Sequence, residues 1–493
     1  MLLKLPDYQS SYDNQFLSSL SLSLSEKIAF YKKEIENIAD TSFNKQQKKL
    51  CLDILDKATE ENIDKIYQFI TQRVKTGFVF DIAPEVQNDC IALIEKDKKL
   101  SFESNALGEK LTHKLIIGEN YDALKNLPAV YENKIDFIYI DPPYNTESTR
   151  TDGNSLTDIE GQNTGKFIYR DKYSRTGWLN MMNERLQLAR KLLSDKGVIF
   201  ISIDDNEQAY LKVLCDDVFG EENFVKELVW ESGKPFGYKA TTHTWPRCHE
   251  YILHYAKNIN KMIYNPTYTL EISSNGKQIL TSSIIKAKEN GIYSMDWIQG
   301  AKESVGFGSG QKPVNLIKKL LQNGTSKNSI ILDFFAGSGT TGQAVMELNE
   351  EDGGKRQFIL CTNNENGIAE NITYERLRRV INGVGTKGEQ IKWQYSKDKK
   401  SLTNNNLDVF RIGYHQLEIE DYEKGEQLIK QAKEVFKQLD NNFELKGEFD
   451  IYNKLASLKP YSEEDRAECA KGFSYQNKQA GEVEDVENEE EQD

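Results

Sequence analysis

The hydrophobic pattern changes twice along the 493 residues of the chain. From residue 22 to about residue 73, apolar residues recur three and four positions apart, in segments such as "SEKIAFYKKEIENI" and "CLDILDKATEENIDKIYQFITQRV". This spacing places apolar side chains on one face of a helix, and Ser23 and Ser25 are suitable N-caps. The pattern predicts a helical N-terminal region.

From residue 114 the pattern becomes an alternation of short apolar runs and amphipathic helices. The runs are "KLIIG", "IDFIYID", "GVIFISID", "SIILDFFAG" and "RQFILCT". They are β-branched or aromatic and end at turn residues, which is typical of buried parallel strands. Residues 177–197 carry an apolar helical face between two of these runs, as a helix connecting parallel strands would. We therefore predict an α/β fold.

Changes of composition divide the chain further. The alternation stops after residue 230, apart from the strand-like "HEYILHYAK", and a third pattern with a helix at 422–439 follows residue 385. The last twelve residues contain eight acids and no base, which is typical of a disordered end. We predict a helical region 1–110, a first α/β half 111–229, an insert 230–305 that includes a core strand 249–256, a second α/β half 306–385, an α+β unit 386–476 and an acidic tail 477–493.

Composition excludes several classes of protein. Hydrophobic residues make up 38% of the chain, and no apolar run approaches the roughly 18 to 20 residues of a membrane span. Residues 1–25 lack the pattern of a signal peptide, so we predict a cytoplasmic protein without a membrane partner. The six cysteines show no metal-ligand spacing. The net charge of −14 argues against a DNA-coating protein, although the acidic tail carries about half of it.

The segment "LDFFAGSGTTGQAVMEL", residues 332–348, joins a strand to a helix through glycines. Gly337 and Gly339 allow a ligand to approach the backbone, and the helix start near Thr340 offers free N–H groups. Taken alone, this pattern favours a nucleotide-type cofactor site about as strongly as an ordinary turn. It is not a P-loop, because GxxxxGK[ST] is absent.

Two kinds of cofactor remain open for this turn. Gly337, Gly339 and Gly342 fit the GxGxxG spacing of dinucleotide sites. Asp333 at the strand end suits a positively charged amino group better than a pyrophosphate, and Glu365 follows the next strand, where an acid can bind ribose hydroxyls. An amino acid joined to a nucleoside fits both acids, and S-adenosylmethionine is such a molecule.

The segment "IDFIYIDPPYNTEST", residues 135–149, ends a strand with an acid, two prolines and a tyrosine. Pro-Pro alone is explained more simply by a stiff turn with a solvated acid, but the complete set at a strand end favours a site. Asp141 and the Pro142 carbonyl would each accept one N–H of an exocyclic base amino group and direct the nitrogen lone pair at a methyl donor. Tyr144 offers a flat face to a base that has left the duplex.

Five motifs occur in an order that resembles a known family. They are "DPPYNT", "WLNMMNERLQLARKLLSDKGVIFISIDDNE", "HEYILHYAK", "QKP" and "DFFAGSGTT", within residues 114–385. Together they resemble the β class of amino-directed DNA methyltransferases, in which the tetrapeptide precedes the cofactor glycines, and most of all the modification (Mod) subunits of Type III restriction-modification systems. The resemblance implies a Rossmann-like S-adenosylmethionine-dependent methyltransferase fold with a mostly parallel sheet and helices on both faces.

The same resemblance assigns residues to two sites and requires no metal. The catalytic residues would be Asp141, Pro142, Pro143 and Tyr144, with DPPY favouring adenine N6 over cytosine N4. Residues that would bind S-adenosylmethionine are Glu119, Lys312, Pro313, Asp333, Phe335, Ala336, Gly337, Ser338, Gly339, Thr340 and Glu365. Glu119 departs from the acid of the family's Gly-Asp turn, and a helix-start charge explains Lys312 equally well.

Target recognition is expected in the insert, since this class reads DNA with the segment between "HEYIL" and "QKP". Candidate contacts to bases or phosphates are Lys234, Lys239, His243, Trp245, Arg247 and Lys302. Each of them alone is more typical of a surface residue or a core aromatic. The insert is short for a Type III subunit, so we expect contributions from the N-terminal helices, the C-terminal unit or a second subunit.

These patterns predict a site-specific adenine-N6 DNA methyltransferase that acts on double-stranded DNA with a flipped adenine. The resemblance further implies a homodimer and an ATP-dependent restriction (Res) partner, since this chain has no Walker motif. Cytosine-N4 or RNA base methylation is one alternative. A non-catalytic recognition subunit is another, although the intact DPPY and FAGSGT argue against a dead enzyme.

Overall fold

A computed structural model provides the fold of the chain. It describes residues 23–37, 45–71, 90–104, 108–144, 175–231, 248–286, 311–388, 400–416, 422–441, 443–444 and 454–457. These residues belong to two compact units, Met1–Glu85 and Val86–Asp493. Among the described residues, none of the helices combines the length and the apolar character that crossing a membrane requires.

The first unit contains the three helices α2 (Leu24–Asn37), α3 (Lys45–Asp56) and α4 (Ile63–Thr71). Tyr31 stacks on Tyr67 at 3.8 Å between ring centroids, and its hydroxyl donates to Asp64 at 2.6 Å. The two segments quoted from the sequence form three helices, because the second segment is divided between α3 and α4. The chain turns at residues 57–62, where the Thr59 backbone N–H donates to the Asn62 side chain at 2.7 Å and the Ile63 N–H donates to the Thr59 carbonyl at 2.9 Å.

The second unit is built on a ten-stranded sheet with the order β1-β12-β2-β11-β10-β3-β4-β6-β5-β9. The strands are β1 (Cys90–Phe102), β2 (Leu111–Ile117), β3 (Ile135–Ile140), β4 (Leu193–Ile203), β5 (Phe224–Glu231), β6 (His249–Ala256), β9 (Ile284–Lys286), β10 (Ile330–Asp333), β11 (Gln357–Thr362) and β12 (Asn405–Gln416). Six of its nine pairings among the described strands are parallel. The predicted α/β class and mostly parallel sheet are confirmed.

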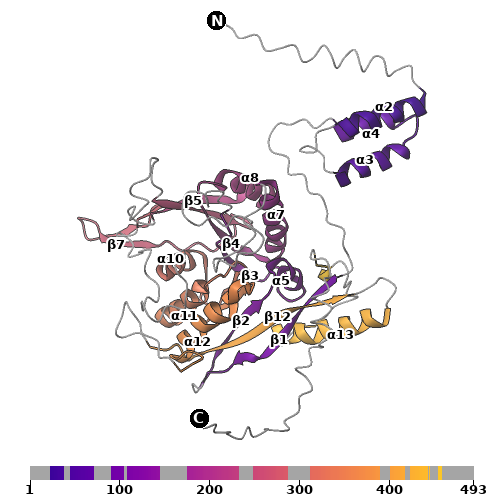
Figure 1. Cartoon of the computed structure of the whole chain (residues 1–493). Helices are drawn as coiled ribbons and strands as arrows, with labels where there is room; N and C mark the ends of the chain where they lie inside the picture. Colours follow the sequence, from indigo (N-terminus) through magenta and orange to yellow (C-terminus); the bar gives the residue numbers. More distant parts are fainter. Residues whose placement is uncertain are drawn as a thin grey trace, which may run out of the picture. The chain divides into compact units, whose positions relative to one another are not determined.

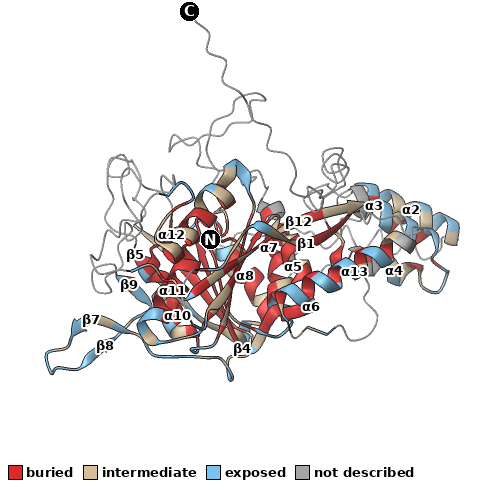
Figure 2. Cartoon of the chain, turned by 90° about the horizontal axis from the view of Figure 1, so that it is seen from below, coloured by how far each residue is buried: buried red, intermediate tan, exposed pale blue. Residues whose placement is uncertain are grey.

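Helices cover both faces of the sheet (Figure 1). One face carries α5 (Asn120–Asn126), α6 (Pro128–Tyr131), α7 (Arg175–Leu192), α8 (Gln208–Phe219) and α13 (Tyr422–Leu439). The other carries α10 (Val314–Gly324), α11 (Thr340–Asp352) and α12 (Glu375–Asn382). Short helical turns are η2 (Glu221–Asn223), η4 (Glu365–Gly367) and η5 (Ala369–Tyr374). The strands and the inner helix faces are buried (Figure 2), which accounts for the apolar runs.

Two of the predicted domain boundaries are wrong. The helical region does not reach residue 110, because β1 pairs antiparallel with β12 at the edge of the main sheet. Residues 386–476 are not a separate unit either, because β12 also pairs in parallel with β2. Only the first half of β1 is fully buried, so the sequence of this edge strand lacks the continuous apolar run of a central strand.

The predicted insert 230–305 lies partly within the main sheet. Strands β5 and β9 pair with each other, and β5 pairs with β6. Outside that sheet stands an antiparallel ribbon of β7 (Tyr268–Ile272) and β8 (Gln278–Leu280), which is mostly exposed (Figure 2). The Lys319 side chain of α10 anchors the ribbon by donating to the Tyr268 carbonyl at 2.7 Å. The ribbon is therefore attached to the helix that begins beside Lys312.

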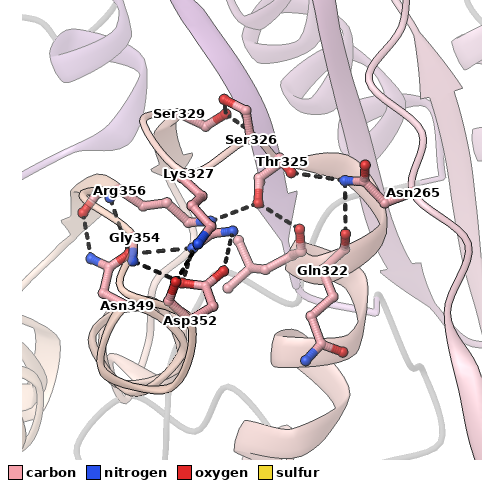
Figure 3. Close-up of polar contacts among 11 residues, drawn as sticks. Asn265, Gln322, Thr325, Ser326, Lys327, Ser329, Asn349, Asp352, Gly354 and Arg356 are labelled. Carbon is pink, nitrogen blue, oxygen red and sulfur yellow. Dashed lines mark hydrogen bonds and ion pairs between the residues drawn. The ribbon is translucent and has the colours of Figure 1, made fainter.

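A buried polar network closes the other end of α10 (Figure 3). Arg356, only 3% exposed, pairs with Asp352 at 2.9 Å and donates to the Thr325 hydroxyl at 2.8 Å. Asn265 donates to the carbonyls of Gln322 and Thr325 at 3.0 and 2.9 Å. The ends of α10 and α11 and the segment before β7 are thus fixed to one another.

Candidate active site

The two chemical motifs meet at one edge of the sheet. Strands β3 and β10 are neighbouring parallel strands, so their carboxyl ends, which lead into Asp141 and Asp333, lie at the same edge. After β3 the chain continues to β4 on one side, whereas after β10 it continues to β11 on the other. Such a reversal of strand order leaves a crevice at the carboxyl ends, where α/β sheets bind their ligands.

Asp141 is bound by side chains from two distant segments. The Lys312 ammonium, which precedes α10, lies 2.9 Å from each carboxylate oxygen of Asp141. The same ammonium lies 2.7 Å from the Tyr144 hydroxyl and 3.1 Å from Oε2 of Glu250. The Tyr144 hydroxyl is also within donating distance of Asp141 at 2.8 Å and of Glu250 at 2.9 Å. We call these four residues the carboxylate tetrad.

Glu250 reaches this edge because β6 runs antiparallel to β4. Its neighbour Tyr251 is paired with Ile203, the last residue of β4. The first residues of β6 therefore lie where the parallel strands end. Sequence reasoning did not single out Glu250, and the only signal was an acid at the start of the buried strand "HEYILHYAK".

Burial and neighbouring charges together raise the pKa values of Asp141, Tyr144 and Lys312. Burial raises the pKa of Asp141, the Lys312 charge opposes that rise, and the Glu250 charge adds to it. Burial, followed by the charge of Asp141, raises the pKa of Tyr144 far above its usual range. Although burial disfavours the Lys312 ammonium, Asp141 and Glu250 together raise its pKa. At neutral pH Lys312 is therefore charged and Tyr144 carries its proton.

The backbone carbonyls of the two prolines in the tetrapeptide differ in their hydrogen bonding. The Trp178 indole N–H, on α7, donates to the Pro143 carbonyl at 2.8 Å. Within the described residues, no side chain or backbone N–H donates to the Pro142 carbonyl. One carbonyl is thus used to fix the turn, while its neighbour keeps its capacity to accept a hydrogen bond.

The glycine turn between β10 and α11 forms a backbone cradle. Gly337 has φ of 47° and Gly339 has φ of 77°, both in the left-handed region that favours glycine. A Cβ on Gly337 would meet no atom closer than 3.8 Å, so the space above this backbone is open to a ligand. The turn leads directly into Thr340, the first residue of α11, and the first N–H groups of a helix have no partner within the helix. The residues 335–340 named from the sequence lie together here.

Asp333 braces this turn from within. One carboxylate oxygen accepts the Phe335 backbone N–H at 3.0 Å, and the other accepts the Thr341 hydroxyl at 2.6 Å. The residue is 2% exposed, and burial raises its pKa to about 7. The structure shows both oxygens engaged in the turn, whereas the sequence interpretation paired this acid with a cofactor amino group.

The remaining predicted cofactor residues lie on neighbouring strand ends. Glu119 caps α5 after β2, and Arg185 of α7 donates to it at 2.5 Å. Asn120 beside it donates to the Phe334 carbonyl at 2.9 Å, which ties this turn to the glycine turn. Glu365 is exposed after β11. The turns after β2, β11 and β10 thus follow one another along the sheet edge. An amino acid joined to a nucleoside fits this row of turns, with the glycine cradle at one end and Glu119 and Glu365 toward the other.

Some predicted residues are placed differently or lie outside the described part of the chain. Lys312 was grouped with the cofactor, but its ammonium contacts the catalytic tetrapeptide; Pro313 is the N-cap of α10. The predicted DNA contacts Lys234, Lys239, His243, Trp245, Arg247 and Lys302, the acidic tail 477–493 and the loop 145–166 fall outside the described residues. Where the chain is described, no three His, Cys, Asp or Glu side chains converge as metal ligands.

A family model described as a DNA methylase matches residues 135–375, from the first residue of β3 into α12. That range contains both the DPPY tetrapeptide and the glycine turn, which meet at one sheet edge. The chain contains a DNA methylase domain of the N6/N4 family. A second model, described only as an uncharacterised conserved protein, matches residues 28–136.

Several curated proteins are similar to this chain in sequence. The Mod subunit of the Type III restriction-modification enzyme StyLTI from Salmonella typhimurium is 33% identical over 56% of this chain and 57% of its own length. The EcoPI Mod subunit of Escherichia phage P1 is 29% identical over 51% of this chain and 57% of its own. The chain thus spans a little over half the length of these two relatives.

Two further similarities cover about half of the chain. The Type II methyltransferase M.KpnI from Klebsiella pneumoniae is 26% identical over 55% of this chain and 85% of its own length. Among solved structures, the M1.HpyAVI–SAM complex is 18% identical, covers 53% of this chain and 96% of its own, and has a TM-score of 0.34.

Proposed function

We propose that this chain transfers a methyl group from S-adenosylmethionine to the N6 amino group of adenine in DNA. The observation that carries this proposal is the position of Asp141 and the Pro142 carbonyl, two acceptors at the end of β3, beside the glycine cradle of the DNA methylase domain. Within the described residues, neither acceptor faces another backbone N–H. A planar amino group with two N–H donors is complementary to such a pair.

The two acceptors address the difficulty of the reaction. The lone pair of an exocyclic amino nitrogen is delocalised into the ring, so this nitrogen is a weak nucleophile. Acceptors on both N–H bonds favour the pyramidal nitrogen of the transition state over the planar ground state. Asp141 is also placed to take the one proton that the nitrogen must lose after methylation, before that proton passes to solvent.

S-adenosylmethionine, when bound at the glycine cradle, would supply a methyl carbon that leaves its sulfonium sulfur with the bonding electron pair remaining on sulfur. The contribution of the chain is to position the two reactants. The cradle fixes one reactant next to β10, and the tetrapeptide holds the other at the end of β3, so the nitrogen and the methyl carbon meet in one orientation. Tyr144 provides the ring on which a flipped adenine stacks, which offsets part of the cost of unpairing.

The proposed setting is the cytoplasm, with the chain acting on double-stranded DNA as the modification and recognition subunit of a Type III restriction-modification system. The relatives named as Mod subunits support this setting. A homodimer and a Res partner are parts of the same proposal. Recognition of the target sequence belongs to the segments around the ribbon β7–β8, which is anchored to α10.

Methyl transfer from labelled S-adenosylmethionine to unmethylated bacterial genomic DNA tests the proposal. The wild type should transfer label, and Asp141→Ala should reduce the rate by at least about a hundredfold, the loss typical of removing one transition-state hydrogen bond. Asp136→Ala is the matched control, since Asp136 lies on the same strand at its opposite end and binds Ser194 at 2.9 Å. Equal rates for Asp141→Ala and wild type would contradict the catalytic assignment.

A further inference from the structure

The Lys312 ammonium lies where the target amino group would have to bind in the proposed reaction. Its Nζ atom is within 3.1 Å of four oxygens, namely both carboxylate oxygens of Asp141, the Tyr144 hydroxyl and Oε2 of Glu250. The Lys312 side chain is 7% exposed. The acceptor surface of Asp141 that would bind a target amino group is therefore covered by another nitrogen that donates hydrogen bonds.

The donors of the tetrad have alternative acceptors within reach. An ammonium has three N–H bonds, yet four oxygens surround it, and two carboxylates share its single positive charge. The Tyr144 hydroxyl has one proton, and it lies within 2.9 Å of both carboxylates. Each donor therefore has two alternative carboxylate partners, Asp141 and Glu250, at nearly equal distances.

A static ion pair would block the proposed function. Asp141 serves as an acceptor for the incoming amino group only if Lys312 gives up at least one of its oxygens. A buried ammonium that moved away without a partner would pay the cost of an unpaired charge. Glu250 lies within reach and provides that partner, so the exchange keeps the ammonium paired throughout.

We propose that Lys312 and Glu250 form an exchange pair, in which the Lys312 ammonium occupies the place of the target amino group until a base arrives and then shifts to Glu250. This inference rests on the proposed function. Lys312 and Glu250 act through Asp141, so they are positioning residues. The exchange makes the site selective for an occupant that donates a hydrogen bond to Asp141 in place of Lys312, which a base bearing only carbonyl oxygens at that edge does not do.

The exchange pair also sets the charge of the acceptor. The titratable groups that face Asp141 are Lys312, Glu250, Tyr144, Tyr139 and Asp333. Lys312 is the one cation among these described groups. Removing it leaves Asp141 beside the Glu250 charge without compensation, which raises the pKa of Asp141 further. Removing the Glu250 charge has the opposite effect and fixes Lys312 on Asp141.

The pH dependence of methyl transfer separates this role from a structural ion pair. The probe is unmethylated bacterial genomic DNA with labelled S-adenosylmethionine, assayed with the full chain. Lys312→Met should move the acidic limb of the kcat/KM profile upward by about one pH unit, the size of shift that a neighbouring charge produces. Glu250→Gln should move that limb downward and raise the KM for DNA about tenfold.

The double variant provides the decisive comparison. Lys312→Met combined with Glu250→Gln removes both charges, so its acidic limb should return to within about half a pH unit of the wild-type limb. Lys318→Met is the control for loss of a largely buried lysine near Lys312, because Lys318 of α10 pairs with Glu347 at 3.5 Å and also with Glu351, away from the tetrad. This control should leave the pH profile unchanged.

Two results would overturn the inference in distinguishable ways. If Lys312→Met and Glu250→Gln lower the melting temperature but leave the pH profile and the KM for DNA at wild-type values, the pair is structural and the exchange does not occur, while the proposed function stands. If the wild type itself transfers no label, the proposed function fails and the exchange fails with it. Thermal unfolding of each variant shows that the loss is not one of folding.

Discussion

Two aspartates at the carboxyl ends of neighbouring parallel strands, the partly buried Asp141 and the buried Asp333, are used in opposite ways. Among the described residues, Asp333 binds atoms of its own turn, Phe335 N and Thr341 Oγ1, within eight residues along the chain. Asp141 binds Lys312, 171 residues away, and Tyr144, which also reaches Glu250 across 106 residues. The first carboxylate stabilises a fixed cradle, whereas the second belongs to an interchangeable set of partners. The glycine turn around Asp333 is therefore held by local contacts, whereas the contacts of Asp141 come from distant segments and can be exchanged.

Replacing each aspartate by alanine should give the largest contrast. Asp333→Ala removes two buried hydrogen bonds to a charged group, so we expect a loss of roughly 2–5 kcal/mol in the free energy of unfolding and at least tenfold weaker binding of S-adenosylmethionine. Asp141→Ala leaves Lys312 paired with Glu250 and should cost about 1 kcal/mol or less. Thermal unfolding and calorimetric titration measure both, and equal losses of stability would contradict the comparison.

The pH dependence of stability should single out Asp333. Burial raises the pKa of Asp333 from 3.8 to about 7. A raised pKa means that its contribution to stability is complete below pH 3.8 and is lost as the pH rises through about 7. Asp333→Asn removes this titration, so relative to the wild type it should gain on the order of 2 kcal/mol between pH 5 and pH 8. A constant difference across that range, measured by thermal unfolding, would refute this reading.

Substitutions of Thr341 test whether its hydrogen bond to Asp333 stabilises the glycine turn. Thr341→Val keeps the shape of the side chain but removes the hydroxyl that donates to Asp333. We expect a loss of about 1–3 kcal/mol, because a buried carboxylate oxygen is left without its donor. Thr341→Ser keeps the hydroxyl and is the matched control. Denaturant unfolding compares the two, and similar losses would show that packing, not the hydrogen bond, is responsible.

The smallest effect is expected at Trp178, which holds the tetrapeptide from outside. Trp178→Phe removes the indole N–H that donates to the Pro143 carbonyl and should cost about 1 kcal/mol and a severalfold drop in kcat. Trp230→Phe is the control, since its buried indole N–H has no hydrogen-bond partner among the described residues. This control should be neutral or stabilising; a reversed order in thermal unfolding would contradict the account.

The local part of the site was predictable from sequence. The apolar runs that end at Asp141 and Asp333 predicted two parallel strands with acids at their carboxyl ends. Gly337 and Gly339 predicted the cradle, because a backbone without Cβ adopts such a turn readily. Both residues have positive φ in the structure. Short-range patterns contain this information, since the residues that form each turn are adjacent in the chain.

The long-range part was not predictable in the same way. The contact of Lys312 with Asp141 depends on where α10 begins, and that of Glu250 depends on β6 running antiparallel to its neighbours. The spacing of nearby residues in the sequence predicts neither of these contacts. The edge strand β1 was also missed, because half of it is polar and its pairing with β12 joins segments at opposite ends of the chain.

The most direct test of the central claim is to identify the methylated nucleoside. Unmethylated bacterial genomic DNA would be incubated with the full chain and S-adenosylmethionine, digested to nucleosides and examined by mass spectrometry, with Asp141→Ala in parallel. The account predicts N6-methyldeoxyadenosine with the wild type and at most a trace with the variant. N4-methyldeoxycytidine as the product, or N6-methyldeoxyadenosine at equal levels from both proteins, would contradict it.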